Sequence, residues 1–152
     1  DSLVVANCDP LVGESSELIQ MNVMNGKTLR TLTCPEDLNS GIVFDNTYFW
    51  GSSYEKKELY KFHPFSGETD LVISMEFPVC GLAWNGEHLI VGLDKDPEKN
   101  STTIAILDIE TQKILGETDV EAKIGGLAFA ENMIFFTNVE KKEIHVTRIK
   151  MN

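Results

Sequence analysis

Positive charge is scarce in this chain of 152 residues. It has 13 Lys and Arg residues against 24 Asp and Glu residues, which gives a net charge of −11. The basic residues are dispersed or stand beside acids, as in Glu55–Glu58 and Glu140–Glu143. Because affinity for phosphates depends on clustered Lys and Arg, we expect no nucleic acid among the partners.

Long apolar runs and helical periodicity are also missing. No stretch of 18 apolar residues occurs, so we expect no membrane insertion. No window of a dozen residues has the spacing of an amphipathic helix, so we expect essentially no helix. The hydrophobic content of 42% is enough to build a core, and the length suits one domain over residues 1–152.

Cysteines are few and far apart. Cys8, Cys34 and Cys80 form no C-x-x-C motif, which gives little support to metal binding or to a thioredoxin-like role. Two interpretations stay open: small buried side chains at strand ends, or a disulfide between Cys8 and Cys34 that leaves Cys80 as a thiol. None of the three histidines is placed to activate a thiol, so we predict no catalytic residue and no metal ligand.

The chain begins with Asp1 instead of Met, and no signal peptide precedes it. We interpret this as the loss of upstream residues, by processing or by the choice of boundaries. An extracellular or periplasmic location is slightly favoured over a cytoplasmic one.

What the sequence does have is an internal repeat. Leu3–Leu29 aligns without a gap on Leu89–Leu115, at an offset of 89 − 3 = 86 residues. Three copies open with a glycine and an apolar run, at Gly41–Phe44, Gly81–Trp84 and Gly126–Phe129, spaced by 81 − 41 = 40 and 126 − 81 = 45 residues. These periods are typical of propeller blades.

Each repeat predicts a four-stranded antiparallel meander. The glycine-led run is followed by a turn signal and a second apolar run, which together indicate a hairpin. A third strand with period-two alternation and a fourth strand follow. We expect repeats at about 1–40, 41–80, 81–125 and 126–152, with three, four, four and three strands, the first repeat lacking its innermost strand and the last its outermost.

The run Gly81-Leu-Ala-Trp-Asn-Gly-Glu-His-Leu-Ile-Val91 resembles the blades of YVTN-type and glutamine-cyclotransferase-like propellers. Phe135–Asn138 stands where the YVTN signature stands, and Leu59–Gly67 is similar to the segment "L-Y-K-L-D-P-x-T-G". The resemblance implies an all-β fold, a β-propeller whose ligands bind near the central channel. It would be either a four-bladed ring or half of a larger propeller.

Oxygen-bearing residues gather in one long loop, Asp94–Thr102. Such a loop could coordinate calcium, although the spacing of an EF-hand is absent, and an ordinary solvated loop is the alternative. We expect no other cofactor. Aromatic residues recur at equivalent strand positions, which predicts that they pack between blades. They are Phe44, Phe49, Trp50, Trp84, Phe129, Phe135 and Phe136.

The predicted function is that of a non-catalytic binding module with a ligand or a protein on its loop face. Four polar residues are predicted to contact that ligand: Asp9, Ser53, Asp94 and Asn138. Tyr54 and Phe65 are the loop aromatics that could stack on a sugar. The partner could also be a second copy that completes the propeller as a homodimer.

The alternative is a glutaminyl-peptide cyclotransferase-like enzyme, or a fragment of a larger propeller enzyme. For that chemistry Asp94 and Asp9 are the only nominees as acid–base carboxylates.

Overall fold

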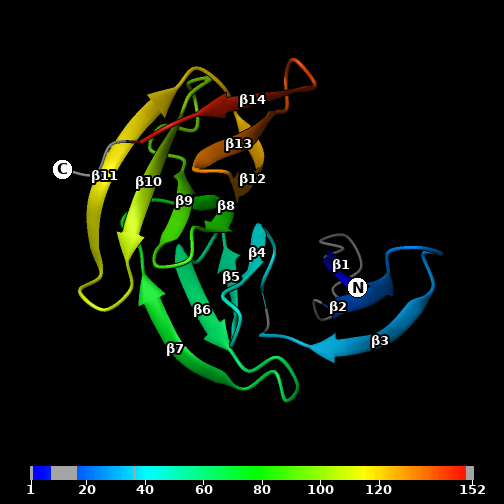
Figure 1. Cartoon of the computed structure of the whole chain (residues 1–152). Helices are drawn as coiled ribbons and strands as arrows, with labels where there is room; N and C mark the ends of the chain where they lie inside the picture. The colour runs from blue at the N-terminus through cyan, green and yellow to red at the C-terminus, as the bar shows by residue number, and fades with distance from the viewer. Residues whose placement is uncertain (1, 8–16, 36, 150–152) are drawn as a thin grey trace.

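The computed structural model describes residues 2–7, 17–35 and 37–149, and these residues form fourteen β-strands and no helix. The strands make four antiparallel sheets, which we call sheets I to IV (Figure 1). Sheet I holds β1 (Ser2–Asn7), β2 (Glu17–Asn22) and β3 (Thr28–Thr33). Sheet II holds β4 (Gly41–Phe44), β5 (Phe49–Ser53), β6 (Glu58–Phe62) and β7 (Thr69–Ser74). Sheet III holds β8 (Val79–Trp84), β9 (Leu89–Leu93), β10 (Thr102–Asp108) and β11 (Lys113–Val120). Sheet IV holds β12 (Ile124–Ala130), β13 (Met133–Asn138) and β14 (Glu143–Thr147).

Every sheet is a meander, because strands that follow one another in sequence are neighbours in the sheet. The counts of three, four, four and three strands confirm the pattern predicted from the repeat. The sheets are arranged around an axis, with β4, β8 and β12 innermost and β3, β7 and β11 on the outside (Figure 1). Since no described residue is helical, none belongs to a helix that could cross a membrane.

Short polar side chains fix the hairpin turns between first and second strands. Asp45 Oδ1 accepts hydrogen bonds from the backbone N–H groups of Thr47 and Tyr48, at 2.8 and 2.7 Å. Asn85 Oδ1 does the same one repeat later, for Glu87 and His88 at 2.9 and 2.7 Å. These side chains replace ladder partners at the turn, which explains why Asp or Asn stands there in both repeats.

In the second strand of a sheet, successive side chains point alternately toward the preceding sheet and the following sheet. The sheets are thereby packed one after another in a series. Phe49 packs toward sheet I with Leu18, whereas the next residue, Trp50, packs toward sheet III with Leu89. Ile90 in turn packs toward sheet IV. The core therefore consists of three hydrophobic clusters, each between consecutive sheets, as the period of two residues requires. We call them the I–II, II–III and III–IV clusters.

Glycine permits the close approach of the inner strands. A Cβ atom on Gly41 would lie 3.2 Å from the backbone nitrogen of Leu82 in β8, and one on Gly81 would lie 3.2 Å from Cγ of Leu127 in β12. Such distances are tighter than ordinary contact, so the side-chain-free position lets neighbouring backbones meet. This is the physical reason for the glycine that opens the runs Gly41–Phe44 and Gly81–Trp84, whereas a Cβ on Gly126 would meet nothing closer than Thr137 Oγ1 at 3.8 Å.

Sheets I and IV each keep one face without a neighbouring sheet among the described residues. On sheet I that face carries Leu3, which is 53% exposed, and on sheet IV it carries Ile144 and Val146, which are 74% and 54% exposed. We call these the free faces of sheets I and IV. The molecule is thus an open arc of four sheets with the β-propeller arrangement, and the fold class predicted from the repeat is confirmed.

Four of the seven aromatic positions differ from the prediction that all of them are core. Phe49, Trp50 and Phe136 are buried, but Phe44 is 45% exposed, and Trp84, Phe129 and Phe135 are only half-buried. Phe44 faces the less tightly packed side of the arc beside sheet I, whereas Trp84, at the same repeat position, packs against the II–III cluster.

Candidate functional site

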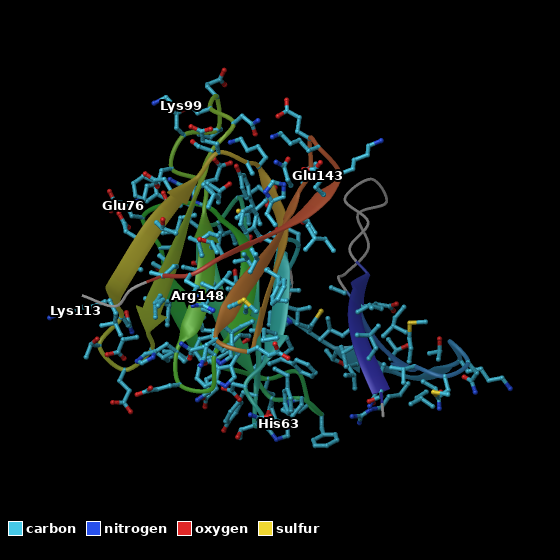
Figure 2. All side chains as sticks on the ribbon, turned by 45° about the horizontal axis from the view of Figure 1, so that its top comes forward. His63, Glu76, Lys99, Lys113, Glu143 and Arg148 are labelled. Carbon is cyan, nitrogen blue, oxygen red and sulfur yellow. The ribbon has the colours of Figure 1, made fainter. Side chains whose placement is uncertain are left out.

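The predicted ligand residues occupy the same place in successive repeats. Ser53 and Asn138 end β5 and β13, and Asp94 follows β9 directly. Asp9 lies outside the described residues. Figure 2 shows this end of the molecule near Lys99 and Glu143, with His63 at the opposite end.

Ser53 and Asn138 both serve their own turns. The backbone N–H of Lys56 donates to Ser53 Oγ at 3.4 Å, and that of Lys141 donates to Asn138 Oδ1 at 3.0 Å. Both side chains are buried, with exposed fractions of 0% and 2%. These contacts account locally for a polar residue at the strand end, and the hydrogen bonds described for Asp94 come from Tyr54 and Lys123 instead.

Asp94 instead belongs to a polar cluster of three sheets, which we call the Asp94 cluster: Tyr54, Asp94 and Lys123. Tyr54 Oη donates to Asp94 Oδ2 at 2.5 Å, and Lys123 Nζ donates to Asp94 Oδ1 at 2.9 Å. Lys123 Nζ also donates to the backbone oxygen of Asp96 at 3.2 Å. Asp94 is 7% exposed, so its charge is compensated where water is largely excluded.

The electrostatics of the cluster hold Tyr54 as a neutral donor. Its hydrogen bond to Asp94, reinforced by burial, raises the pKa of Tyr54 to about 12. The phenol therefore keeps its proton throughout the physiological range. Both carboxylate oxygens of Asp94 accept hydrogen bonds, so this cluster links sheets II, III and IV through polar contacts. The sequence could not reveal it, because Lys123 lies 29 residues from Asp94.

Cys80 lies beside this cluster as a free, half-buried thiol. Its Sγ donates to the backbone oxygen of Gly92 at 3.4 Å. Burial, reinforced by the charge of Asp94, raises the pKa of Cys80 to about 11, so the thiolate that would act as a nucleophile does not form near neutral pH. Cys8 lies outside the described residues, so the disulfide between Cys8 and Cys34 stays a prediction.

The described parts of the chain contain no preformed set of metal ligands. No group of three or more His, Cys, Asp or Glu residues gathers there in a way that could hold an ion. Within the Asp94–Thr102 loop, Asp96 pairs with Lys99 at 3.1 Å. The hydrogen bond from Lys99 lowers the pKa of Asp96.

A cleft of about 660 Å³ lies elsewhere, between sheets I and II, and we call it the I–II cleft. Apolar side chains make most of its wall, and a few polar groups stand among them. Its lining residues are Ser2, Leu3, Val4, Gln20, Arg30, Leu32, Ile42, Val43, Phe44, Asn46, Thr47, Phe49, Pro64 and Phe65. The volume falls within the range of small-molecule sites.

One cation is held in place at this cleft. Arg30 Nε donates to Gln20 Oε1 at 2.6 Å, and the Arg30 guanidinium carbon lies 4.8 Å from the centre of the Phe65 ring. Phe65 itself is 67% exposed. Sequence reasoning singled out Phe65 as an exposed aromatic but missed the cleft, because its walls come from two repeats.

The comparisons with known proteins support the fold alone. No family model and no curated protein matches the sequence. Among solved structures, the chain is similar to the computationally designed Ika4 protein, with 14% identity, a TM-score of 0.55, and coverage of 88% of this chain and 80% of that one. It is also similar to the glutaminyl cyclase of Myxococcus xanthus, with 15% identity, a TM-score of 0.52, and coverage of 75% and 52%.

A third similar structure is Hsv2 of Kluyvelomyces marxianus, with 17% identity, a TM-score of 0.54, and coverage of 88% of this chain and 42% of that one. The chain thus spans about half or less of the two natural proteins. Identities this low establish a shared fold alone.

Proposed function

We propose that this chain is a non-catalytic binding module and that its ligand occupies the I–II cleft. The ligand has an apolar, aromatic-containing body and an anionic group. The observation that carries this proposal is the wall of the cleft, where exposed Phe44 and Phe65 stand beside the guanidinium of Arg30, which contacts Gln20 and the Phe65 ring. In a chain of net charge −11, a cation at the wall of an apolar cleft favours a ligand with a negative charge.

The fluorescent anion anilinonaphthalene sulfonate tests this proposal, because it has an aromatic body and one negative charge. We expect saturable fluorescence enhancement with the folded chain. Phe44→Ser and Arg30→Gln should each weaken the dye's affinity by about three- to tenfold, since each removes one kind of contact worth of the order of 1 kcal/mol.

Val72→Ser is the matched control, because Val72 is 44% exposed against 45% for Phe44 but lies on β7, away from the cleft lining. It should leave the dye's affinity unchanged. Equal weakening by all three substitutions, or no saturable binding, would contradict a ligand site in this cleft.

The alternative function is glutaminyl-peptide cyclisation, which the likeness to a glutaminyl cyclase favours. It needs a carboxylate able to exchange a proton with substrate, whereas Asp94 accepts from Tyr54 and Lys123. A cyclisation assay on a peptide with N-terminal glutamine separates the two functions. We expect no product above the uncatalysed rate, and turnover that is lost in Asp94→Asn would establish the enzyme.

The partner proposed with this function is a second copy of the chain, seated on the free faces. Leu3 is 53% exposed, but Leu89, its equivalent at the offset of 86 residues, is 0% exposed in the II–III cluster. Ile144 on sheet IV is 74% exposed, whereas Ile104 at the same place in sheet III is 0% exposed. The free face of sheet I therefore corresponds to the face of sheet III that is buried against sheet II, and the free face of sheet IV corresponds to the face of sheet III that is buried against sheet IV. A head-to-tail contact between two copies would join two faces of these two kinds.

Light scattering should then report a particle of about twice 17.0 kDa. Ile144→Glu should return it to a monomer, because a charge on the apolar face would be buried in the dimer. Met24→Glu is the control, since Met24 is 89% exposed on a hairpin turn. A wild-type chain that stays monomeric at high concentration would contradict the dimer.

A further inference from the structure

Strand β1 leaves one edge of sheet I without a partner in the part of the chain that the structure describes, because the order of that sheet is β1, β2, β3. The repeat identifies what such an edge pairs with elsewhere. Leu3 and Val5 correspond to Leu89 and Val91 of β9 at the offset of 86 residues. Those two residues pair with Trp84 and Leu82 of the inner strand β8. The free edge of β1 is therefore the edge with which an inner strand of sheet I would pair.

The I–II cleft lies along this edge. Ser2, Leu3 and Val4 of β1 form one wall, and Ile42, Val43 and Phe44 of β4 form another. In the next repeats the equivalent space is filled by backbone, since β4 pairs with β5 and packs against β8, and β8 pairs with β9 and packs against β12. The cleft thus has the position that an inner strand takes in sheets II and III.

We propose that the I–II cleft binds an extended peptide segment, which adds to the free edge of β1 as an antiparallel strand and lies with its other side against β4. This deepens the proposed function and rests on it, because the same cleft is the site. Backbone hydrogen bonds to β1 supply affinity, and the alternating side chains supply selectivity.

The sequence of the preferred segment follows from the three inner strands that fill equivalent positions. Gly41–Phe44, Gly81–Trp84 and Gly126–Phe129 share the order glycine, Ile or Leu, Val or Ala, aromatic. Glycine is required where a Cβ on Gly41 or Gly81 would approach the next inner strand to 3.2 Å. The third residue is apolar because it turns toward the following sheet, as Val43 does in the II–III cluster and Ala83 in the III–IV cluster.

The probe is a fluorescent peptide with the sequence of β12, Ile124–Ala130, and two aspartates added at its carboxyl end, which supply solubility and the anionic group of the proposed ligand. Fluorescence anisotropy with the full chain measures its binding. We expect a scrambled peptide with the same two aspartates to bind about tenfold more weakly or worse, because it keeps the charge and apolarity but loses the order.

Proline substitution in the probe separates strand addition from general apolar binding. In an antiparallel pair, successive residues direct their N–H groups to opposite sides. Proline at the position of Leu127 and proline at that of Ala128 should therefore differ, one weakening binding by about tenfold and the other by about threefold or less. Equal loss at both positions would overturn the proposal.

Hydrogen exchange locates the added strand. Among the amides of Leu3–Val5 in β1, those that point away from β2 should gain protection when the peptide binds, whereas those of β14, the outer edge of sheet IV, should not. Phe44→Ser should weaken the peptide's affinity by about tenfold, and Val72→Ser should leave it unchanged. Protection on β14 or on neither edge would contradict binding at β1.

The two proposals fail separately. If anilinonaphthalene sulfonate binds in the cleft and the peptide neither binds nor displaces it, strand addition is wrong and the small-ligand site stands. If neither binds, the cleft is not a ligand site and both proposals are wrong.

Discussion

Replacement of Trp50 by alanine is expected to lower the free energy of unfolding by about 3–5 kcal/mol. The side chain is 0% exposed and lies in the II–III cluster with Leu59 and Leu89. Its Nε1 also donates to Asp45 Oδ2 at 2.8 Å, and Asp45 anchors the adjoining turn. The substitution would therefore open a cavity and leave a turn carboxylate without one of its donors.

Denaturant unfolding followed by far-ultraviolet circular dichroism measures this loss without depending on tryptophan fluorescence. Trp84→Ala is the comparison, because Trp84 is only half-buried and its Nε1 has no hydrogen-bond partner among the described residues. It should cost clearly less than Trp50→Ala. The reverse order would mean that the depth of burial in the II–III cluster does not decide the cost of the two truncations.

Gly51→Ala is expected to destabilise the chain by about 1–3 kcal/mol through overpacking. A Cβ atom at this position would lie 1.9 Å from Cδ1 and 2.8 Å from Cγ of Leu38. Leu38 is itself 0% exposed within the I–II cluster, so its side chain cannot move aside without disturbing Phe62 and its neighbours.

Gly126→Ala is the matched control, since the nearest atom to its added Cβ would be Thr137 Oγ1 at an ordinary 3.8 Å. It should change stability by less than about 0.5 kcal/mol. Chemical denaturation of Gly51→Ala, Leu38→Ala and the double variant supplies a further check. The double variant should cost less than the sum of the two single ones, because the shortened side chain makes room for the new methyl group; simple additivity would contradict the clash.

Most of the fold could be predicted from the sequence, because every copy of the repeat shows the pattern of the same antiparallel meander. The offset of 86 residues predicted which strands correspond, and the glycine-led runs predicted the inner strands. The first and last residues of the strands were harder to predict. β12 begins at Ile124 and not at Gly126, since the pairing with β13 shifts register between Ile124 and Leu127, and an irregularity of this kind leaves no periodic signal.

The site was harder to predict because its contacts cross repeats. Ser53, Asp94 and Asn138 look alike as polar residues at strand ends, yet two of them hold their own turns and one binds Tyr54 and Lys123. Phe44 and Trp84 share a repeat position, but their surroundings differ. Repetition predicts what sheets have in common, whereas a site arises where one sheet departs from the others.

Because each hydrophobic cluster joins only consecutive sheets, the molecule is energetically a short linear array, and each sheet depends on the one or two beside it. Sheet I is tied in through a single cluster, with the I–II cleft opening along the same boundary. Thermal fluctuation can detach that end while sheets II to IV persist. A protease would accordingly shorten the folded chain from sheet I inward, leaving a core whose lifetime is set by Trp50 and the residues around it.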